Sequence, residues 1–328
     1  MNGTLTDVPG LEVGHHTNLE AGTGCTVILA RGGAIGGVDV RGAAPGTRET
    51  DLLRADTTVE FVYGITLAGG SAYGLAAATG VMRYLEGQGV GHRVGEFTVP
   101  IVPAAIIFDL GIGESTVRPT DADGYTAAYS ASSGIVEQGS VGGGTGATVG
   151  KALGRDSSMK GGVGSYSMNL GGGVVLAALA VVNAIGSVHD PDDGRILAGA
   201  LHDGQPVSGV GIYSDPEFGR FDRSGQPEPL SNTTIAVIAT NLKLTKAQAN
   251  RLATIAHDGL ALSIRPTHTL HDGDTVFALA TGEVDADEEY PRACVLAPTV
   301  MARAIVNGIL TATSLHGHPS YREVYGDG

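Results

Sequence analysis

The sequence predicts a mixed α+β fold whose strands are buried between layers of other elements. Short runs rich in β-branched residues alternate along the chain with alanine-rich runs of helical periodicity. Several of the strand-like runs are apolar at every position, as expected for strands that are covered on both faces. The chain has 52 glycines, no tryptophan and only 5% aromatic residues. Its core must therefore be built from Ala, Val, Ile and Leu, with backbones packed closely at glycines.

Six strands and three helices follow from these patterns in chain order. The predicted strands carry β-branched residues, and Gly, Asp or Asn lie near their ends; they cover residues 25–30, 61–67, 102–108, 174–182, 234–240 and 275–280. The predicted helices cover residues 71–86, 245–264 and 295–313. In the second helix, Thr245 can cap the N-terminus, and Leu252, Ile255, Ala256 and Leu260 recur at helical spacing.

Composition and charge exclude several classes of protein. The 328 residues include 20 basic and 34 acidic ones, so the net charge of 20 − 34 = −14 disfavours a nucleic-acid partner. With 42% hydrophobic and 16% charged residues, the chain is expected to fold. Cys25 and Cys294 each lie in an apolar run, which predicts buried thiols and neither a disulfide framework nor a zinc site.

We also expect a soluble, cytoplasmic protein with one catalytic domain over residues 1–328. The first residues show no basic segment followed by an apolar one, so no secretory signal is expected. The longest apolar stretch, residues 174–185, is interrupted by Asn183 and is too short to span a membrane. Residues 190–231 are polar and rich in Gly, Pro and Asp, which predicts a long loop.

A glycine-rich segment, GGGTGATVGK at residues 142–151, is the first candidate for chemistry. It fails as a phosphate-binding loop, because Thr145 replaces the first required glycine and Ala152 replaces the magnesium-binding Ser or Thr. It also fails the dinucleotide pattern, with Val149 at the third glycine position. No nucleotide cofactor is expected. The glycines fit a tight turn or a close backbone approach to a ligand, and Lys151 is either partly buried there or, as the segment alone favours, solvated.

Two further segments carry polar groups of uncertain use. His268, His271, Asp272 and Asp274 could hold a metal, although their spacing matches no known metal motif. The two aspartates could instead orient another catalytic group, or simply form an Asp-Gly-Asp turn, which is the reading that local sequence favours. Asn183 either donates a hydrogen bond to an oxyanion or ends its strand.

The junction Ser231-Asn232-Thr233-Thr234 is more informative, because a polar loop passes into a strongly β-forming run without a turn. A threonine at such a place suggests a nucleophile that becomes N-terminal by chain cleavage. The free α-amine of Thr233, with an ordinary pKa of about 7.7–8.0, would then act as the base for its own hydroxyl. An ordinary loop-to-strand entry is the alternative.

These motifs occur together in one known family. The pairing of NTTIAV with HDGDTVFALATG about forty residues later is the most specific, and GLEVGHHTN, LAGGSAYGLAAATGV, VGGGTGATVGK and VVNAIGSV lie upstream. On these residues most of the chain resembles the P1 family peptidases, which include the D-aminopeptidase DmpA type, the β-peptidyl aminopeptidases and the nylon-oligomer hydrolase NylC. The resemblance implies a four-layer αββα sandwich, similar to that of ornithine acetyltransferases. It also implies autoproteolysis into chains 1–232 and 233–328.

The resemblance assigns roles to individual residues. Thr233 matches the family nucleophile, Asn232 lies on the acyl side of the maturation bond, and Asn183 matches an asparagine near the oxyanion. Asp272 and Asp274 match the Asp-x-Asp pair of NylC-like members, whereas DmpA and β-aminopeptidase members carry Ser and Glu there. The active-site lysine matches Lys151, with Lys160 as a competing alignment. Where some members have a tyrosine that contacts the substrate or oxyanion, this chain has Phe108; Tyr73 could substitute for it.

The function implied is that of a threonine-nucleophile amidohydrolase or aminopeptidase that works through an acyl-ester on Thr233, with no metal or organic cofactor. Expected substrates are short peptides, D- or β-amino-acid amides and linear ω-amino-acid oligomers. A homo-oligomer of αβ heterodimers is expected, without nucleic-acid or membrane partners. The alternatives are an acyltransferase of the ornithine acetyltransferase type, a non-catalytic small-molecule-binding protein, and a metal-dependent enzyme at the His268–Asp274 segment.

Overall fold

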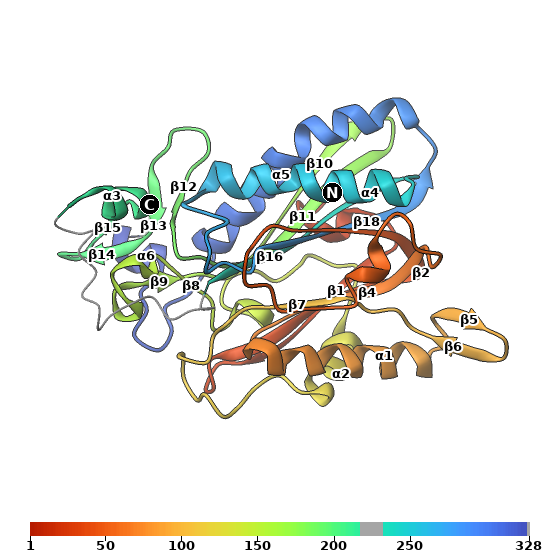
Figure 1. Cartoon of the computed structure of the whole chain (residues 1–328), viewed down its shortest axis with the longest axis horizontal. Coiled ribbons are helices and arrows are strands. Elements are labelled where there is room, and N and C mark those ends of the chain that lie inside the picture. The colour runs from red at the N-terminus through yellow and green to blue at the C-terminus, as the bar shows by residue number, and fades with distance from the viewer. Residues whose placement is uncertain (217–231, 327–328) are drawn as a thin grey trace.

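The computed structural model describes residues 1–216 and 232–326, which form the four-layer αββα sandwich expected from the sequence (Figure 1). The first helix layer holds α4 (Lys246–Ser263) and α5 (Tyr290–Leu310). Beneath it lie β10 (Val163–Gly171), β11 (Val174–Asn183), β16 (Thr233–Leu242) and β18 (Thr275–Val284). The second β layer contains β1 (Leu11–Asn18), β2 (Thr23–Val40), β3 (Thr47–Arg48), β4 (Phe61–Ala68) and β7 (Ala104–Ile106). The last layer holds α1 (Ala77–Gly87) and α2 (Asp121–Ser130).

The two β layers are joined through one long strand. The second half of β2 pairs antiparallel with β18 from Ile35 to Val40, and its first half pairs with β1 and β4. Its register with β4 shifts between Leu29 and Ala34, where β2 passes from one layer to the other. Within the described residues the hydrogen bonds therefore run through a single nine-stranded sheet, in the order β10-β11-β16-β18-β2-β4-β7-β3 with β1 beside β2.

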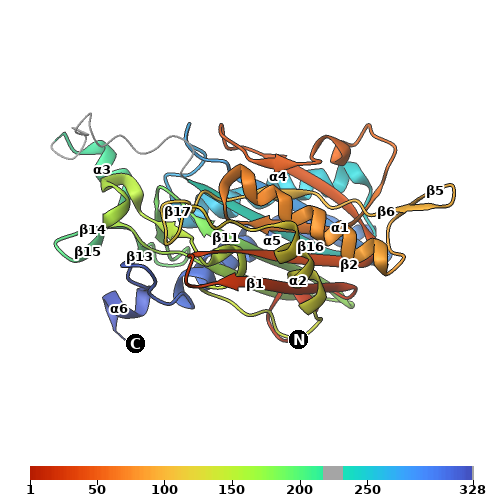
Figure 2. The same ribbon diagram turned by 90° about the horizontal axis from the view of Figure 1, so that it is seen from below.

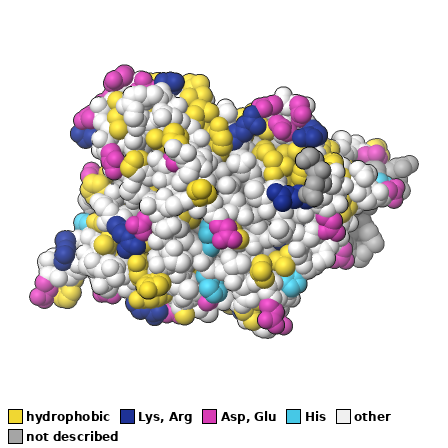
Figure 3. All heavy atoms as spheres, turned by 180° about the vertical axis from the view of Figure 1, so that it is seen from behind, with side chains coloured by type: hydrophobic (Ala, Val, Ile, Leu, Met, Phe, Trp, Pro, Cys, Tyr) yellow, Lys and Arg dark blue, Asp and Glu magenta, His cyan; other side chains and the backbone are white. Residues whose placement is uncertain are grey.

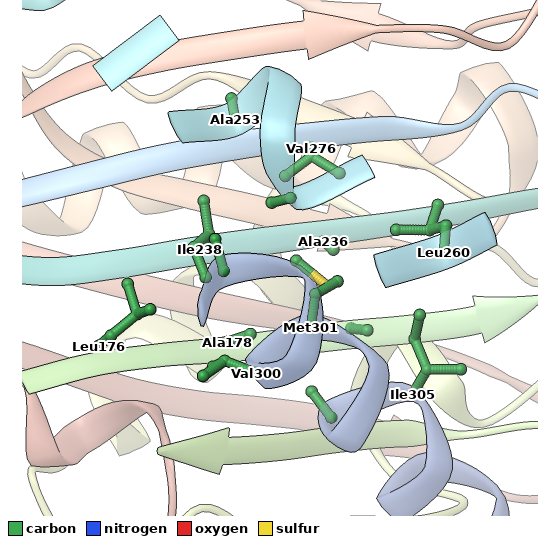
Figure 4. Packing of buried hydrophobic residues seen from close by; sticks show 14 of the residues in the cluster. Leu176, Ala178, Ala236, Ile238, Ala253, Leu260, Val276, Val300, Met301 and Ile305 are labelled. Atoms are coloured by element: carbon green, nitrogen blue, oxygen red, sulfur yellow. The ribbon is translucent and has the colours of Figure 1, made fainter. Parts of the chain in front are cut away.

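Each space between neighbouring layers is filled by its own group of apolar side chains. The group between the first helix layer (α4 and α5) and the first β layer includes Ala236, Ile238, Val276 and Met301 (Figure 4). A second group lies between the two β layers, and Phe277 is its largest fully buried member. A third group packs α1 and α2 against β2 and β4. Strands covered on both faces must be apolar throughout, which is the pattern that the sequence shows.

Alternation along β16 and β11 decides which side chains reach the site. Odd-numbered residues such as Ile235 and Val181 face the space between the β layers. Even-numbered ones such as Ala236 and Val182 face the helices α4 and α5. Thr233 and Asn183 continue the odd series at the ends of their strands. They are paired directly opposite each other in the antiparallel ladder. Both side chains therefore lie at one end of the space between the β layers.

The predicted elements are present, with shifted bounds. The capping of α4 is confirmed: the Thr245 hydroxyl accepts the Gln248 amide N–H, and the Gln248 Oε1 accepts the Thr245 amide N–H. The predicted strand at 102–108 is shorter, because only Ala104–Ile106 pairs with a neighbour. The helix expected at 71–86 begins with a 3-10 segment, Ser71–Ala76, and the one expected at 295–313 starts earlier, at Tyr290. Cys25 is buried as predicted, but Cys294 is only half-buried.

Part of the predicted loop at 190–231 is ordered structure, so that expectation was wrong for residues up to 216; residues 217–231 lie outside the described part. Short elements gather there at one end of the molecule (Figures 1 and 2). Those from the predicted loop are β13 (Ile196–Ala198), β14 (Ala200–His202), β15 (Gln205–Val207) and α3 (Gly209–Ser214). Beside them lie three short elements from other parts of the chain, β12 (Ser187–His189), β17 (Ile264–Arg265) and α6 (Tyr321–Tyr325). The remaining small strands are β5 (His92–Val94), β6 (Phe97–Val99), β8 (Thr148–Val149) and β9 (Met159–Lys160).

Within residues 1–216 and 232–326, one segment has the length and hydropathy of a membrane span. Residues Asp287–Leu310 are long and apolar enough, but 61% of the most apolar stretch is buried inside the protein. This segment contains α5, whose apolar side chains fill the space above the first β layer. On the face shown in Figure 3, Lys and Arg side chains lie scattered among acidic and hydrophobic ones. That face therefore lacks the continuous basic surface typical of nucleic-acid binding.

Candidate active site

The Asn232–Thr233 peptide bond lies buried where β16 begins. Asn232 is fully buried, and Thr233 is only 3% exposed. The Thr233 hydroxyl donates to the carbonyl oxygen of Asn232, and the same oxygen accepts the Gly273 N–H at 3.0 Å. The Gly273 N–H thus donates to this carbonyl oxygen, as a donor to a tetrahedral oxyanion must, and the Thr233 hydroxyl lies beside the same oxygen.

Gly273 stands between the two predicted carboxylates, and it has to be a glycine. A Cβ at this position would lie 2.8 Å from the Thr233 hydroxyl and 2.7 Å from the Ala44 carbonyl oxygen. The backbone beside it pairs across the gap, since Asn232 and Asp272 form a parallel bridge. The glycine therefore allows the Asp272–Asp274 backbone to approach the junction closely.

Asp274 holds the start of β16 through one carboxylate oxygen and its own loop through the other. Its Oδ1 accepts the Thr234 N–H at 2.7 Å, and its Oδ2 accepts bonds from the hydroxyl of Thr267 and from His268. Burial alone would raise the pKa of Asp274. The bonds from His268, Thr234 and Thr267 outweigh burial and hold that pKa below its ordinary value.

Asp272 is buried but has fewer donors. Its Oδ2 accepts the Thr269 N–H at 2.6 Å. Burial and then the charge of Asp274 raise the pKa of Asp272 to about 6. Two neighbouring carboxylates with separated pKa values are typical of a site that handles protons, because one stays ionised while the other exchanges a proton near neutral pH.

Lys151 is linked to the Asn232–Thr233 junction by a hydrogen bond to Asn183, the residue paired with Thr233 in the antiparallel ladder. The Lys151 amine donates to Asn183 Oδ1 at 2.7 Å, and the Thr148 N–H donates to the same oxygen at 3.1 Å. Gly150 precedes the lysine with φ +79°, a conformation that turns the chain toward β11. Lys151 is 7% exposed, so the expectation of a solvated lysine was wrong. Burial, helped by the charge of Arg155, lowers the pKa of the Lys151 amine to about 7.

Lys160 occupies a different place, although it too is fully buried. Its amine donates to the carbonyl oxygens of Gly144, Ala147 and Gly161 at 2.8–3.1 Å. The bonds to Gly144 and Ala147 hold the backbone of the glycine-rich segment, residues 142–151, in its conformation. Of the two lysines that compete in the alignment, Lys151 is the one that the structure connects to Asn183.

The two aromatic candidates are placed differently from each other. Phe108 contacts the site with its backbone: its carbonyl oxygen accepts a hydrogen bond from the Asn183 side-chain N–H at 3.4 Å. Tyr73 is 60% exposed and its ring lies 3.9 Å from the Arg118 guanidinium carbon. Within residues 1–216 and 232–326, no hydrogen bond or ring contact joins Tyr73 to Thr233 or Asn183.

The alternative of a metal centre gains no support from the geometry. His268 is engaged with Asp274 at 2.8 Å. Among residues 1–216 and 232–326, no three or more His, Cys, Asp or Glu side chains are arranged to hold a metal ion. The site is instead a set of hydrogen-bonded acid and amide groups around Thr233.

Sequence reasoning missed several residues that shape this site. Gly273, Thr267 and Thr148 act through backbone or hydroxyl donors, which leave no pattern in a single sequence. His268 was considered only as a metal ligand, and its partnership with Asp274 depends on the turn of the chain between them. The Asp-x-Asp spacing was the one available signal for Gly273, since it places a residue between the carboxylates.

Comparison with known proteins identifies the family. Residues 3–322 match the profile of peptidase family S58. An uncharacterized aminopeptidase of Mycobacterium tuberculosis (strain ATCC 25618 / H37Rv) is 44% identical over 352 aligned positions, which cover 98% of each chain. A 6-aminohexanoate-oligomer endohydrolase of Paenarthrobacter ureafaciens is 33% identical, over 85% of this chain and 75% of the relative.

Solved structures share the fold. A β-aminopeptidase of Burkholderia sp. superposes with a TM-score of 0.69 at 22% identity, covering 99% of this chain and 92% of the other. The L-aminopeptidase D-Ala-esterase/amidase of Ochrobactrum anthropi, described as a variant of the Ntn hydrolase fold, gives a TM-score of 0.71 at 21% identity, covering 95% and 86%. The resemblance expected from the sequence is confirmed. The chain belongs to peptidase family S58 and is a hydrolase that acts on amide bonds.

Proposed function

We propose that Thr233 is the nucleophile of this amidohydrolase and that it becomes N-terminal when the chain cleaves its own Asn232–Thr233 bond. The observation that carries the proposal is the Asn232 carbonyl oxygen, which faces the Thr233 hydroxyl on one side and the Gly273 N–H on the other. Burial of the junction adds support, because another protease needs an exposed segment to reach its bond.

Cleavage would proceed by an N-to-O acyl shift. The Thr233 oxygen forms a bond to the Asn232 carbonyl carbon, its proton passes to Asp272, and the Gly273 N–H stabilises the oxyanion. The carbon–nitrogen bond then breaks and the nitrogen takes up the proton, leaving an ester between Asn232 and Thr233. Water hydrolyses this ester to an Asn232 carboxylate and a free Thr233 hydroxyl and amine. The products are chains 1–232 and 233–328.

In the mature enzyme the same residue would attack substrates. The Thr233 amine takes the proton of its hydroxyl, and the oxygen adds to the substrate carbonyl carbon. The Asn183 amide donates to the oxyanion, and the nearby Lys151 favours the alkoxide. Asp272 and Asp274 accept hydrogen bonds from the Thr233 amine and orient it. The substrate amine leaves with the proton, and water then hydrolyses the acyl-ester on Thr233.

The proposed substrates are small amides: short peptides, D- or β-amino-acid amides, or linear ω-amino-acid oligomers. The similarity to a 6-aminohexanoate-oligomer endohydrolase supports the last class, and the similarity to aminopeptidases supports the first. We further propose that the active protein is a homo-oligomer of αβ heterodimers and that it works in the cytoplasm.

Intact-mass spectrometry tests the maturation. Wild-type protein should give two masses that sum to the 33.2 kDa chain plus one water, and the smaller chain should begin with Thr233 and Thr234. Thr233→Ala should stay whole, whereas Thr233→Ser, which keeps a hydroxyl, should still cleave. An uncut wild-type chain that stays whole for days would refute the proposal, as would cleavage of the alanine variant.

The cleaved protein then allows a test of the reaction. It should release amine from aminoacyl p-nitroanilides, β-amino-acid amides or 6-aminohexanoate oligomers. Adding ornithine with an acetyl donor distinguishes acyl transfer, because formation of acetylornithine faster than hydrolysis would favour a transferase.

A further inference from the structure

We infer that His268 is a positioning residue for this reaction: it keeps the Asp274 carboxylate ionised and fixed beside the backbone of the nucleophile. The inference rests on the proposed function, because it concerns the group that would orient the Thr233 amine. His268 was singled out in the sequence only as a possible metal ligand, and within the described residues no hydrogen bond or ring contact joins its ring to Thr233.

The hydrogen bonds to Asp274 divide its two oxygens between two tasks. Oδ1 accepts the Thr234 N–H at 2.7 Å. Oδ2 accepts three donors from one loop: His268 Nδ1 at 2.8 Å, the His268 N–H at 3.1 Å and the Thr267 hydroxyl at 2.9 Å. Since the carboxylate is only 2% exposed, the loop supplies the hydrogen bonds that water would supply to an exposed carboxylate.

His268 is itself held in one orientation. Its backbone has φ +57°, in the left-handed region, which turns both its amide and its ring toward Asp274. The ring packs edge-on against His257, with centroids 5.0 Å apart and planes at 68°. His257 is fully buried, and its Nε2–H donates to the Asp39 carbonyl oxygen at 2.9 Å. The ring of His268 therefore rests on a fixed neighbour in α4.

The charges around Asp274 explain why a donor is needed. Asp272 lies two residues away and its charge opposes ionisation of Asp274, as burial also does. His268 faces the carboxylate directly, His257 lies behind it with a pKa lowered to about 4 by burial, and Asp39 faces His257. Without the His268 donors, burial and the charge of Asp272 would both favour a neutral Asp274.

The test compares His268→Gly with His268→Asn. Both residues accept a left-handed backbone, so neither adds strain, and only asparagine places an N–H donor where Nδ1 stands. His271→Ala is the matched control, because this half-buried histidine lies three residues away and its ring makes no hydrogen bond within the described residues. Cleaved enzyme of each variant is assayed for kcat/KM against pH with one amide substrate.

In the wild type the acid limb near pH 6 belongs to Asp272, whereas Asp274 stays ionised. His268→Gly should raise the pKa of Asp274 above this limb, so that the limb moves upward by about one pH unit and kcat/KM at pH 6 falls by up to about tenfold. His268→Asn should restore the limb to within about 0.3 pH units of wild type, and His271→Ala should match wild type. If the glycine variant loses activity equally at every pH, or asparagine fails to restore the limb, His268 has a merely structural role and the inference is wrong. If wild-type protein is uncut or inactive, the proposed function fails instead. Circular dichroism of the variants distinguishes loss of folding from both outcomes.

Discussion

Replacing Lys151 with methionine should make the protein more stable below pH 7. Lys151 is 7% exposed, and its pKa falls from 10.5 to about 7, with burial as the main cause. Between these two values the unfolded chain binds a proton that the folded chain does not, so the free energy of unfolding rises with pH across this window. Below pH 7 the folded protein carries the full cost of a buried charge.

The magnitude follows from that gap. A difference between 10.5 and about 7 corresponds to roughly 5 kcal/mol of destabilisation below pH 7. Methionine has a similar length and no charge. Its cost is the lost hydrogen bond to Asn183 Oδ1, worth about 1.5–3 kcal/mol, although that oxygen keeps the Thr148 N–H. The net gain expected at pH 6 is therefore about 2–3.5 kcal/mol; it should disappear between about pH 8.5 and pH 9.5 and become a loss of about 1.5–3 kcal/mol above about pH 10.

Urea unfolding measures this difference best in a background that cannot cleave. Thr233→Ala and the double variant with Lys151→Met are both single chains, so their unfolding can be compared at pH 6 and pH 9.5. Lys160 also has a pKa lowered to about 7 by burial, but it is present in both proteins and cancels in the difference.

One result would refute this reasoning. If Lys151→Met lowers the free energy of unfolding by the same amount at pH 6 and pH 9.5, the buried amine does not lose its proton in this range. The assignment of Lys151 as a poised amine beside Asn183 would then be wrong, whatever the effect on maturation.

Three further predictions concern the groups around Thr233. Asn183→Asp keeps an acceptor for Lys151 but removes the amide donor, so kcat should fall by about 10²–10³-fold with little change in KM; a change in KM alone would argue against an oxyanion role. Gly273→Ala places a Cβ 2.8 Å from the Thr233 hydroxyl and should slow precursor cleavage by about tenfold to hundredfold on a gel time course, whereas an unchanged rate would show that the hydroxyl can move at no cost. For the mature enzyme, kcat/KM should fall as the pH drops below about 6, where Asp272 takes up a proton; a profile that stays flat down to about pH 5 would show that the reaction does not need an ionised Asp272.

The sequence predicted the elements that are uniform in character. The strand over Thr233–Leu242 is apolar on both faces, and α4 has a capping threonine with leucines at helical spacing. Elements of mixed character escaped prediction. In β10, Ser165 and Ser167 are buried and bond to the Ala178 carbonyl oxygen and to Asp7, so small polar residues occupy core positions there. Such residues look like a loop in a single sequence.

The features of the site also fall into those that the sequence predicted and those that only the tertiary structure decided. The sequence by itself predicted which residues would carry the chemistry, because a junction such as Asn232-Thr233 and an Asp-x-Asp pair are local patterns that also mark the family. Only the tertiary structure decided what those residues experience. Lys151, Asn183 and Asp274 come from distant segments, and their burial, their hydrogen-bond partners and the shifted pKa values of Lys151 and Asp274 arise where β11 ends and β16 and β18 begin. Desolvation and hydrogen bonding depend on every neighbour in space, and a single sequence states neighbours only along the chain.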